Sequence, residues 1–307
     1  MKPRPAKNLV CCLLFALSSI AVEAQVTIQF DYSFDVNNFF SGPNIARRTY
    51  LDAAATALQS RLADNLSGIA PSGGNSWTAV FANPATGAQE NVSNPTIAPN
   101  ILLIYAGGRD LGASTLGVGG FGGFSASGTQ AWLDNVSQRG QSGAPLTEFG
   151  PWGGAVTFDI DAAWYFDADP STGEAFPGQN DFYSVALHEI GHLLGIGTAA
   201  SWTNLVNGAN QFTGSESVSL NGGPVPLESN RGHWLNGTTS TLPGTETPQE
   251  VAMDPSLTVG TRKYFTELDI AALIDIGWTV MPIPEPRLAA LFGLGALGIL
   301  IGRRRRR

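Results

Sequence analysis

The sequence predicts an α+β fold, because short apolar segments with the length of strands occur among longer segments with helical periodicity. The expected strands are residues 26–32, 101–105 and 155–160, and the expected helices are residues 44–66, 181–194 and 266–277. At 307 residues the chain can hold one large domain or two subdomains.

The first helix is predicted by its apolar spacing and by the proline before it. Ile45, Leu51 and Leu58 recur at helical intervals, and Pro43 precedes the segment. Residues 107–123 are rich in glycine, which is typical of a loop. This loop contains a formal GxGxxG pattern at Gly117–Gly122, but no amphipathic helix follows it, so we do not predict a dinucleotide site.

The second helix carries an apolar stripe on one face and two histidines on roughly the opposite face. The stripe consists of Phe182, Ala186, Ile190 and Leu193. Gly195 and Gly197 then allow a sharp exit from the helix. Residues 198–250 have little periodicity and are expected to form loops. Thr266 and Asp269 have the spacing of a capping box at the start of the last helix, which Gly277 ends.

Both ends of the chain are predicted to be targeting segments. Residues 1–24 have a basic start, an apolar stretch and a small-residue cleavage site, as in a secretory signal peptide. Both cysteines of the chain, Cys11 and Cys12, lie inside that segment. The exported protein would therefore have neither disulfides nor thiol ligands.

Residues 280–307 contain a Pro-Glu-Pro tripeptide at 284–286, an apolar run at 288–301 and five terminal arginines. As a helix the apolar run would be about 21 Å long, short for a bilayer core of about 30 Å. The tail resembles a PEP-CTERM sorting signal. That resemblance implies processing by an exosortase-type enzyme and a place on the cell surface or in the extracellular matrix of a Gram-negative bacterium. The alternative is a plain C-terminal membrane anchor, and in either case we expect membrane contact only through this tail.

Charge excludes two classes of partner for the segment between the targeting signals. Residues 25–283 contain 8 basic and 23 acidic residues, a net charge of −15. Such a surface does not favour nucleic acid or anionic lipid. Acidic oxygens at Asp167, Asp169 and Glu174 lie in a turn-rich stretch and would suit calcium, although the spacing is not that of an EF-hand.

The strongest chemical signal is the HExxH pattern formed by His188, Glu189 and His192. Residues four apart share one face of a helix, so both imidazoles can bind one zinc ion, and Glu189 can act as general base on a water at that metal. A catalytic zinc usually has three protein ligands. The chain has three histidines, so His233 is the remaining imidazole. A carboxylate, Glu216 or Glu228, is the rival third ligand.

The segment from His188 to Gly195 resembles the start of the metzincin zinc-protease motif HExxHxxGxxH, whose last position is occupied here by Thr198. Gly232-His233-Trp234 and then Met253 follow in an order that resembles leishmanolysin-like metzincins. The resemblance implies that His233 is the third ligand and that Met253 is the Met-turn methionine beneath the zinc. Tyr264 would be an oxyanion stabiliser or a switchable ligand.

The same resemblance implies a metzincin-like fold in two parts. An upper subdomain, residues 25–197, would hold a twisted mixed sheet and the active-site helix. An irregular lower subdomain, residues 198–279, would end in the last helix, with the cleft between the two.

These observations predict an exported zinc metalloendopeptidase that hydrolyses protein or peptide substrates. Two alternatives stay open. The chain could be a non-catalytic surface or matrix protein with a structural zinc site, or a zinc hydrolase of non-peptide amides. Glu189 discriminates against the structural site, because such a site needs no base.

Overall fold

A four-stranded mixed sheet organises the computed structural model, which describes residues 26–167 and 169–281. Its strand order is β1 (Thr27–Asp31), β4 (Ile101–Arg109), β7 (Gly153–Asp159) and β5 (Gly117–Phe121). The first three strands are parallel, and β5 runs antiparallel to β7. The expected mixed sheet is therefore present, and β5 is its edge strand on the side away from β1. The predicted signal peptide and almost all of the predicted sorting tail lie outside the described residues.

A second, antiparallel sheet has the order β3 (Gln89–Ser93), β2 (Ser76–Ala82) and β6 (Gly123–Ser127). Only Gly122 separates β5 from β6, so the chain passes directly from one sheet to the other. A Cβ atom at Gly122 would lie 2.0 Å from the ring of Trp152. Glycine is required there because the backbone lies against the tryptophan ring.

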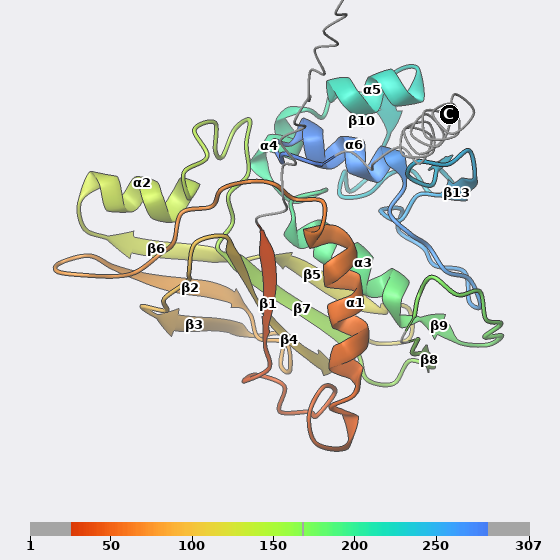
Figure 1. Cartoon of the computed structure of the whole chain (residues 1–307), viewed down its shortest axis with the longest axis horizontal. Coiled ribbons are helices and arrows are strands. Elements are labelled where there is room, and N and C mark those ends of the chain that lie inside the picture. Colours follow the sequence, from red (N-terminus) through yellow and green to blue (C-terminus); the bar gives the residue numbers. More distant parts are fainter. Residues whose placement is uncertain (1–25, 168, 282–307) are drawn as a thin grey trace, which may run out of the picture.

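Both faces of the mixed sheet are covered, and the alternation of side chains along β4 shows how. Leu102, Ile104 and Ala106 belong to the cluster that contains α1 (Arg47–Gln59) and α3 (Phe182–Leu193). Leu103 and Tyr105 belong to a smaller cluster with β2, Trp152 and α2 (Gln130–Gln138). Figure 1 shows α1 and α3 together on one side and α2 apart from them. This double coverage buries the centre of the sheet and fixes α3 against it.

The C-terminal part consists of short elements joined by loops. Its helices are α4 (Ala200–Asn204), α5 (Ser215–Asn221) and α6 (Glu267–Asp275), and its strand pairs are β10 (Gln211–Phe212) with β11 (Val225–Pro226) and β12 (Thr239–Thr241) with β13 (Pro248–Glu250). Earlier in the chain lie the 3-10 turn η1 (Gly42–Asn44) and the pair β8 (Trp164–Tyr165) and β9 (Asn180–Asp181). One buried cluster includes residues from before and after position 198, so the two predicted parts share a core.

Several expected elements differ from the observed ones. The first helix ends at Gln59 and not near 66, because the chain turns to pair Leu62 with Val280. Leu62 and Leu66 are buried from an irregular segment, so their spacing continues the helical pattern without a helix. The prediction of a glycine-rich loop at 107–123 is wrong, because β5 and the start of β6 lie within this segment. Within residues 26–167 and 169–281, no helix has the length and apolar content needed to cross a bilayer.

Candidate metal centre

The helix α3 is fixed at its start by a cap and along its length by burial. Asp181 is the N-cap, and its Oδ2 accepts hydrogen bonds from the backbone N–H and the hydroxyl of Ser184 at 3.1 and 2.6 Å. Phe182, Ala186 and Ile190 of the predicted stripe are fully buried. The apolar side of the helix therefore faces the core, as its periodicity predicts, and the side that carries the histidines faces a cavity.

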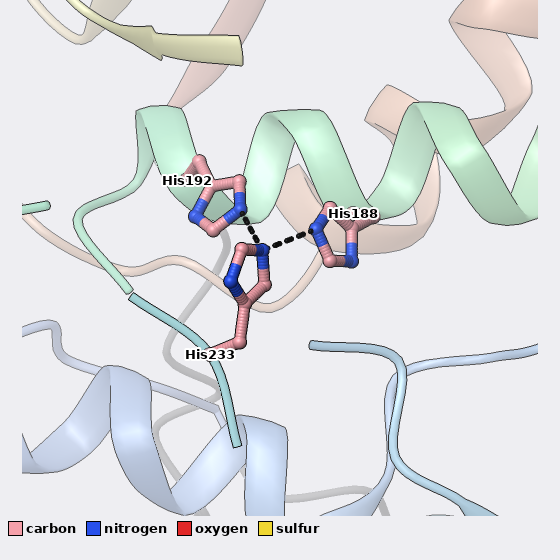
Figure 2. A group of neighbouring side chains, drawn as sticks. All are labelled: His188, His192 and His233. Atoms are coloured by element: carbon pink, nitrogen blue, oxygen red, sulfur yellow. Dashed lines mark hydrogen bonds between the residues drawn. The ribbon is translucent and has the colours of Figure 1, made fainter. Parts of the chain in front are cut away.

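Three imidazoles converge at that cavity (Figure 2). The Nε2 atom of His233 lies 3.2 Å from Nε2 of His188 and 3.0 Å from Nε2 of His192. Three nitrogens bound to one tetrahedral zinc at about 2.0–2.1 Å would lie about 3.3 Å apart. The observed spacing fits a zinc ion with only small movements of the rings, and the three residues form a group able to hold a metal ion.

The other nitrogen of each helical histidine is held by a backbone carbonyl. His188 Nδ1 lies 2.8 Å from the oxygen of Ala252, and His192 Nδ1 lies 2.9 Å from the oxygen of Ile196. A carbonyl oxygen only accepts, so each Nδ1 carries the proton and each Nε2 has a free lone pair. Both rings are thus in the tautomer and orientation that metal binding requires.

Burial also keeps these imidazoles neutral. It lowers the pKa of His188 well below its usual value, with the neighbouring His192 adding to the effect. Burial lowers the pKa of His192 to about 4 and lowers that of His233 as well. Neutral imidazole is the form that binds zinc, so protons compete weakly for the site near neutral pH.

His233 reaches the helix because the backbone that carries it crosses the turn after α3. Gly197 has φ +76°, and a Cβ atom there would lie 1.9 Å from the carbonyl oxygen of Gly232. Thr198 occupies the position of the last metzincin histidine, but its hydroxyl donates to the carbonyl of His192 at 2.6 Å. The imidazole that this turn lacks is therefore supplied by the crossing segment.

Two buried tryptophans anchor the crossing segment. The ring of Trp234 packs against that of Trp202, with centroids 5.1 Å apart. Trp202 Nε1 donates to the carbonyl of Arg231 at 2.9 Å. The backbone N–H of Trp234 donates to the carbonyl of Met253 at 3.1 Å. His233 is thus held on both sides by groups fixed in the core.

Asp269 connects this segment to the chain around Met253. Its carboxylate, which is fully buried on α6, accepts from Trp234 Nε1 and from the backbone N–H groups of Ala252 and Met253 at 2.9–3.2 Å. It also completes the predicted capping box with Thr266. The sequence indicated only the capping role. The signal for a further role was the place of this carboxylate between the apolar residues Leu268 and Ile270.

Glu189 lies beside the histidines in the same cavity and is only 6 % exposed. Burial raises the pKa of its carboxyl to about 8, although the backbone N–H of Gly119 lowers it in part. A carboxyl group with a pKa near the working pH can both take and release a proton.

Met253 packs against α3 at Gly191. A Cβ atom on Gly191 would lie 2.5 Å from its sulfur, and the methionine is fully buried. Met253 therefore packs against the helix one residue before His192, and its role as a Met-turn methionine stays a prediction.

The structure does not place Tyr264 or the candidate calcium ligands at a metal. The hydroxyl of Tyr264 donates to the carbonyl of Pro170 and does not line the histidine cavity. Asp167 pairs with Arg262 at 2.8 Å. Asp169 accepts from Ser171, and Glu174 accepts from Thr172.

The physical reason is a cation that the sequence did not indicate. Arg262 bonds the N-cap Asp181 through two nitrogens at 2.9–3.0 Å and also reaches the carbonyls of Pro170 and Thr172. In the described part of the chain, Asp167, Asp169 and Glu174 do not gather into a metal-binding group. Arg262 is thus the cation that contacts this loop, and calcium binding there stays a prediction.

The rival ligands are also outside the site. Glu228 Oε1 accepts from the backbone N–H of Asn236 at 2.9 Å, and Glu216 lies on α5. Neither belongs to the histidine group.

The carboxylates of Asp110, Asp159 and Asp161 do lie within reach of one another, at the ends of β4 and β7. Asp110 and Asp159 there accept hydrogen bonds from the backbone of Gly112 and Leu111.

The cavity has a volume of about 660 Å³. Residues 114–119 form one wall, α3 forms the floor, and residues 230–233 and 252–257 form the opposite wall. This volume is sufficient for a ligand of several residues next to the histidines.

Comparison with known proteins gives one result that bears on this site. Residues 128–222 match the family model of matrixin, Peptidase_M10. The matched region includes His188, Glu189 and His192 and ends before His233 and Met253. Searches among curated proteins and among solved structures found no match. The match supports a metzincin-like zinc metallopeptidase and is compatible with the mixed sheet and helices observed.

Proposed function

We propose that this chain is an exported zinc endopeptidase that cleaves protein or peptide substrates, with His188, His192 and His233 as its metal ligands and Glu189 as its general base. The observation that carries the proposal is the convergence of three neutral imidazoles beside a buried carboxyl group in an open cavity. The matrixin match over the helix that carries three of these four residues supports the same chemistry.

Zinc bound by the three histidines would polarise the scissile carbonyl and lower the pKa of the attacking water. Glu189 accepts the proton of that water as attack proceeds and delivers it to the leaving amine as the C–N bond breaks. The carbonyls of Ala252 and Ile196 keep the ligand rings oriented throughout.

The edge strand β5 supports a peptide as the substrate. Leu116 to Gly119 line the cavity, and β5 has a neighbouring strand on one side only within the described residues. An extended peptide can bind the part of this edge that lines the cavity, Leu116 to Gly119, through backbone hydrogen bonds. Cleavage within the peptide follows, because the histidines lie beside the strand and not at the end of a closed tunnel.

The test is digestion of an unfolded protein such as casein, followed by mass spectrometry of the products. Internal cleavage, lost on chelation and restored by one equivalent of zinc, is the expected result. A zinc-loaded protein that cleaves neither casein nor peptides would favour the structural zinc site. Hydrolysis of non-peptide amides alone would favour the third candidate.

We further propose that residues 1–24 direct export and that residues 280–307 direct sorting by an exosortase-type enzyme. Support comes from the sequence patterns at the two ends. Mass spectrometry of the protein recovered from its native host tests both. Loss of residues 1–24 and of the terminal arginines is expected, and an intact chain in the cytoplasm would contradict the proposal.

A further inference from the structure

Three of the five residues of β5 are glycines, although glycine is a poor strand residue. Side chains along a strand alternate between its faces, so Gly117 and Gly119 share one face and Val118 and Gly120 share the other. None of the three glycines has a positive φ angle. Backbone conformation therefore does not explain why glycine occurs here.

The face shared by Gly117 and Gly119 lies against α3 at Glu189, and Figure 1 shows β5 beside that helix. A Cβ atom on Gly117 would lie 2.7 Å from both Cγ and Oε1 of Glu189. A Cβ atom on Gly119 would lie 2.3 Å from the backbone oxygen of the same residue. A Cβ atom on Gly120 would meet nothing within 4 Å. The requirement for glycine thus coincides with contact to Glu189.

The two contacts differ in what would have to move. At Gly117 all three nearest atoms belong to the end of the Glu189 side chain, so a methyl group would displace the carboxylate. At Gly119 the nearest atoms are the helix backbone, so a methyl group would separate β5 from α3. Both glycines line the histidine cavity.

We propose that Gly117 and Gly119 are positioning residues for Glu189. By lacking side chains, they let β5 close over α3 and leave one place for the carboxylate, buried between strand and helix beside the metal ligands. This inference rests on the proposed function for its catalytic consequence, while the positioning itself is a property of the fold.

The positioning is tested first without any assay of activity, by thermal unfolding of Gly117→Ala, Glu189→Ala and the double variant. Gly117→Ala should lower the Tm. The loss should disappear in the Glu189→Ala background, because that change removes the three atoms nearest to the new methyl group. Gly119→Ala should lower the Tm in both backgrounds, and Gly120→Ala in neither. If Gly117→Ala fails to fold, folding of the double variant gives the same result.

The catalytic consequence is tested by the kinetics of casein-derived peptide cleavage at measured zinc content. Gly117→Ala should keep one zinc per chain and a KM within about twofold, while kcat falls by about tenfold or more, because small misplacement of a reacting group is costly. Gly120→Ala, the matched control on the same strand, should retain wild-type kcat.

The outcomes separate this inference from the proposed function. Equal stability and kcat of Gly117→Ala and Gly120→Ala would overturn the positioning role, and so would a Tm loss that Glu189→Ala does not relieve. If the wild type and Gly120→Ala both bind zinc yet cleave nothing, the proposed function fails. Thermal unfolding of the single and double variants would then still decide whether the glycines position the carboxylate of Glu189.

Discussion

Replacing Asp269 by asparagine tests how the segments around the three histidines are held together. The two carboxylate oxygens accept five hydrogen bonds. Oδ1 accepts from Trp234 and Met253, and Oδ2 accepts from Ala252 and from the N–H and hydroxyl of Thr266. An amide presents one oxygen and one NH₂ group, which cannot accept. In either orientation, at least two buried donors lose their acceptor.

An unsatisfied buried donor costs about 1–3 kcal/mol, so Asp269→Asn should lower the free energy of unfolding by about 2–6 kcal/mol. This is a large part of the stability of a typical domain, about 5–15 kcal/mol. Zinc affinity should also fall, by about 10–100-fold, because Trp234 adjoins one ligand and the carbonyl of Ala252 orients another.

The assay is urea unfolding, paired with competition for zinc by a chromophoric chelator. Asp275 of the same helix is the matched control, since it accepts from Glu216 and Ser217 but is partly exposed. Water can replace its lost acceptor, so Asp275→Asn should cost less than about 1 kcal/mol. Equal small losses in the two variants, with unchanged zinc affinity in both, would refute the role assigned to Asp269.

Three further predictions concern the ligands, their titration and the cap of α3. His233→Ala should lose most of the bound zinc while keeping the fold, as measured by metal content and circular dichroism; retained zinc would return the third ligand to a carboxylate. In the metal-free protein, the lowered pKa of His192, about 4 against 6.5 unfolded, contributes stability that is present above pH 6.5 and lost toward pH 4. The raised pKa of Glu189, about 8 against 4.5, contributes stability that is present below pH 4.5 and lost as the pH rises through 8. The two contributions oppose each other between about pH 4.5 and 6.5, and above about pH 6.5 only that of Glu189 still changes. The Tm should therefore fall between about pH 6.5 and 8, and Glu189→Gln should abolish the fall; a fall that persists in that variant would reject the assignment. Arg262→Lys should cost about 2 kcal/mol and expose the 167–174 loop to limited proteolysis, because lysine cannot bond Asp181 through two nitrogens; unchanged stability and resistance to proteolysis would contradict this role.

The helix α3 could be predicted from sequence because local rules agree there. Its apolar stripe and the glycines after it indicate the same element, and the structure has it at Phe182–Leu193 with Asp181 as its N-cap. The same holds for α6, where Thr266 and Asp269 form the expected capping box. In both, the signals lie within a few residues of the element they define.

The strand β5 could not be predicted, because its glycines are explained only by partners distant in sequence. Glu189 and Trp152 leave no room for side chains at Gly117, Gly119 and Gly122. Locally, such a composition is typical of loops. Contact across the fold overrides this local preference.

The approach of His233 to α3 depends on the crossing of Gly197 and Gly232, which no local pattern encodes. Counting histidines was the only sequence argument from the residues themselves. The acidic loop shows the opposite case, since its oxygens suggested calcium while Arg262, about 90 residues later, supplies the positive charge. No local pattern indicates that Arg262 contacts this loop.

In the proposed mechanism, Glu189 transfers protons at a zinc ion held by three histidines. The most direct measurement is casein cleavage by the wild type and by Glu189→Gln at equal, measured zinc content. We expect one zinc per chain in both proteins, cleavage by the wild type, and at least about a hundredfold loss of kcat in the variant. Wild-type turnover by zinc-loaded Glu189→Gln would contradict it.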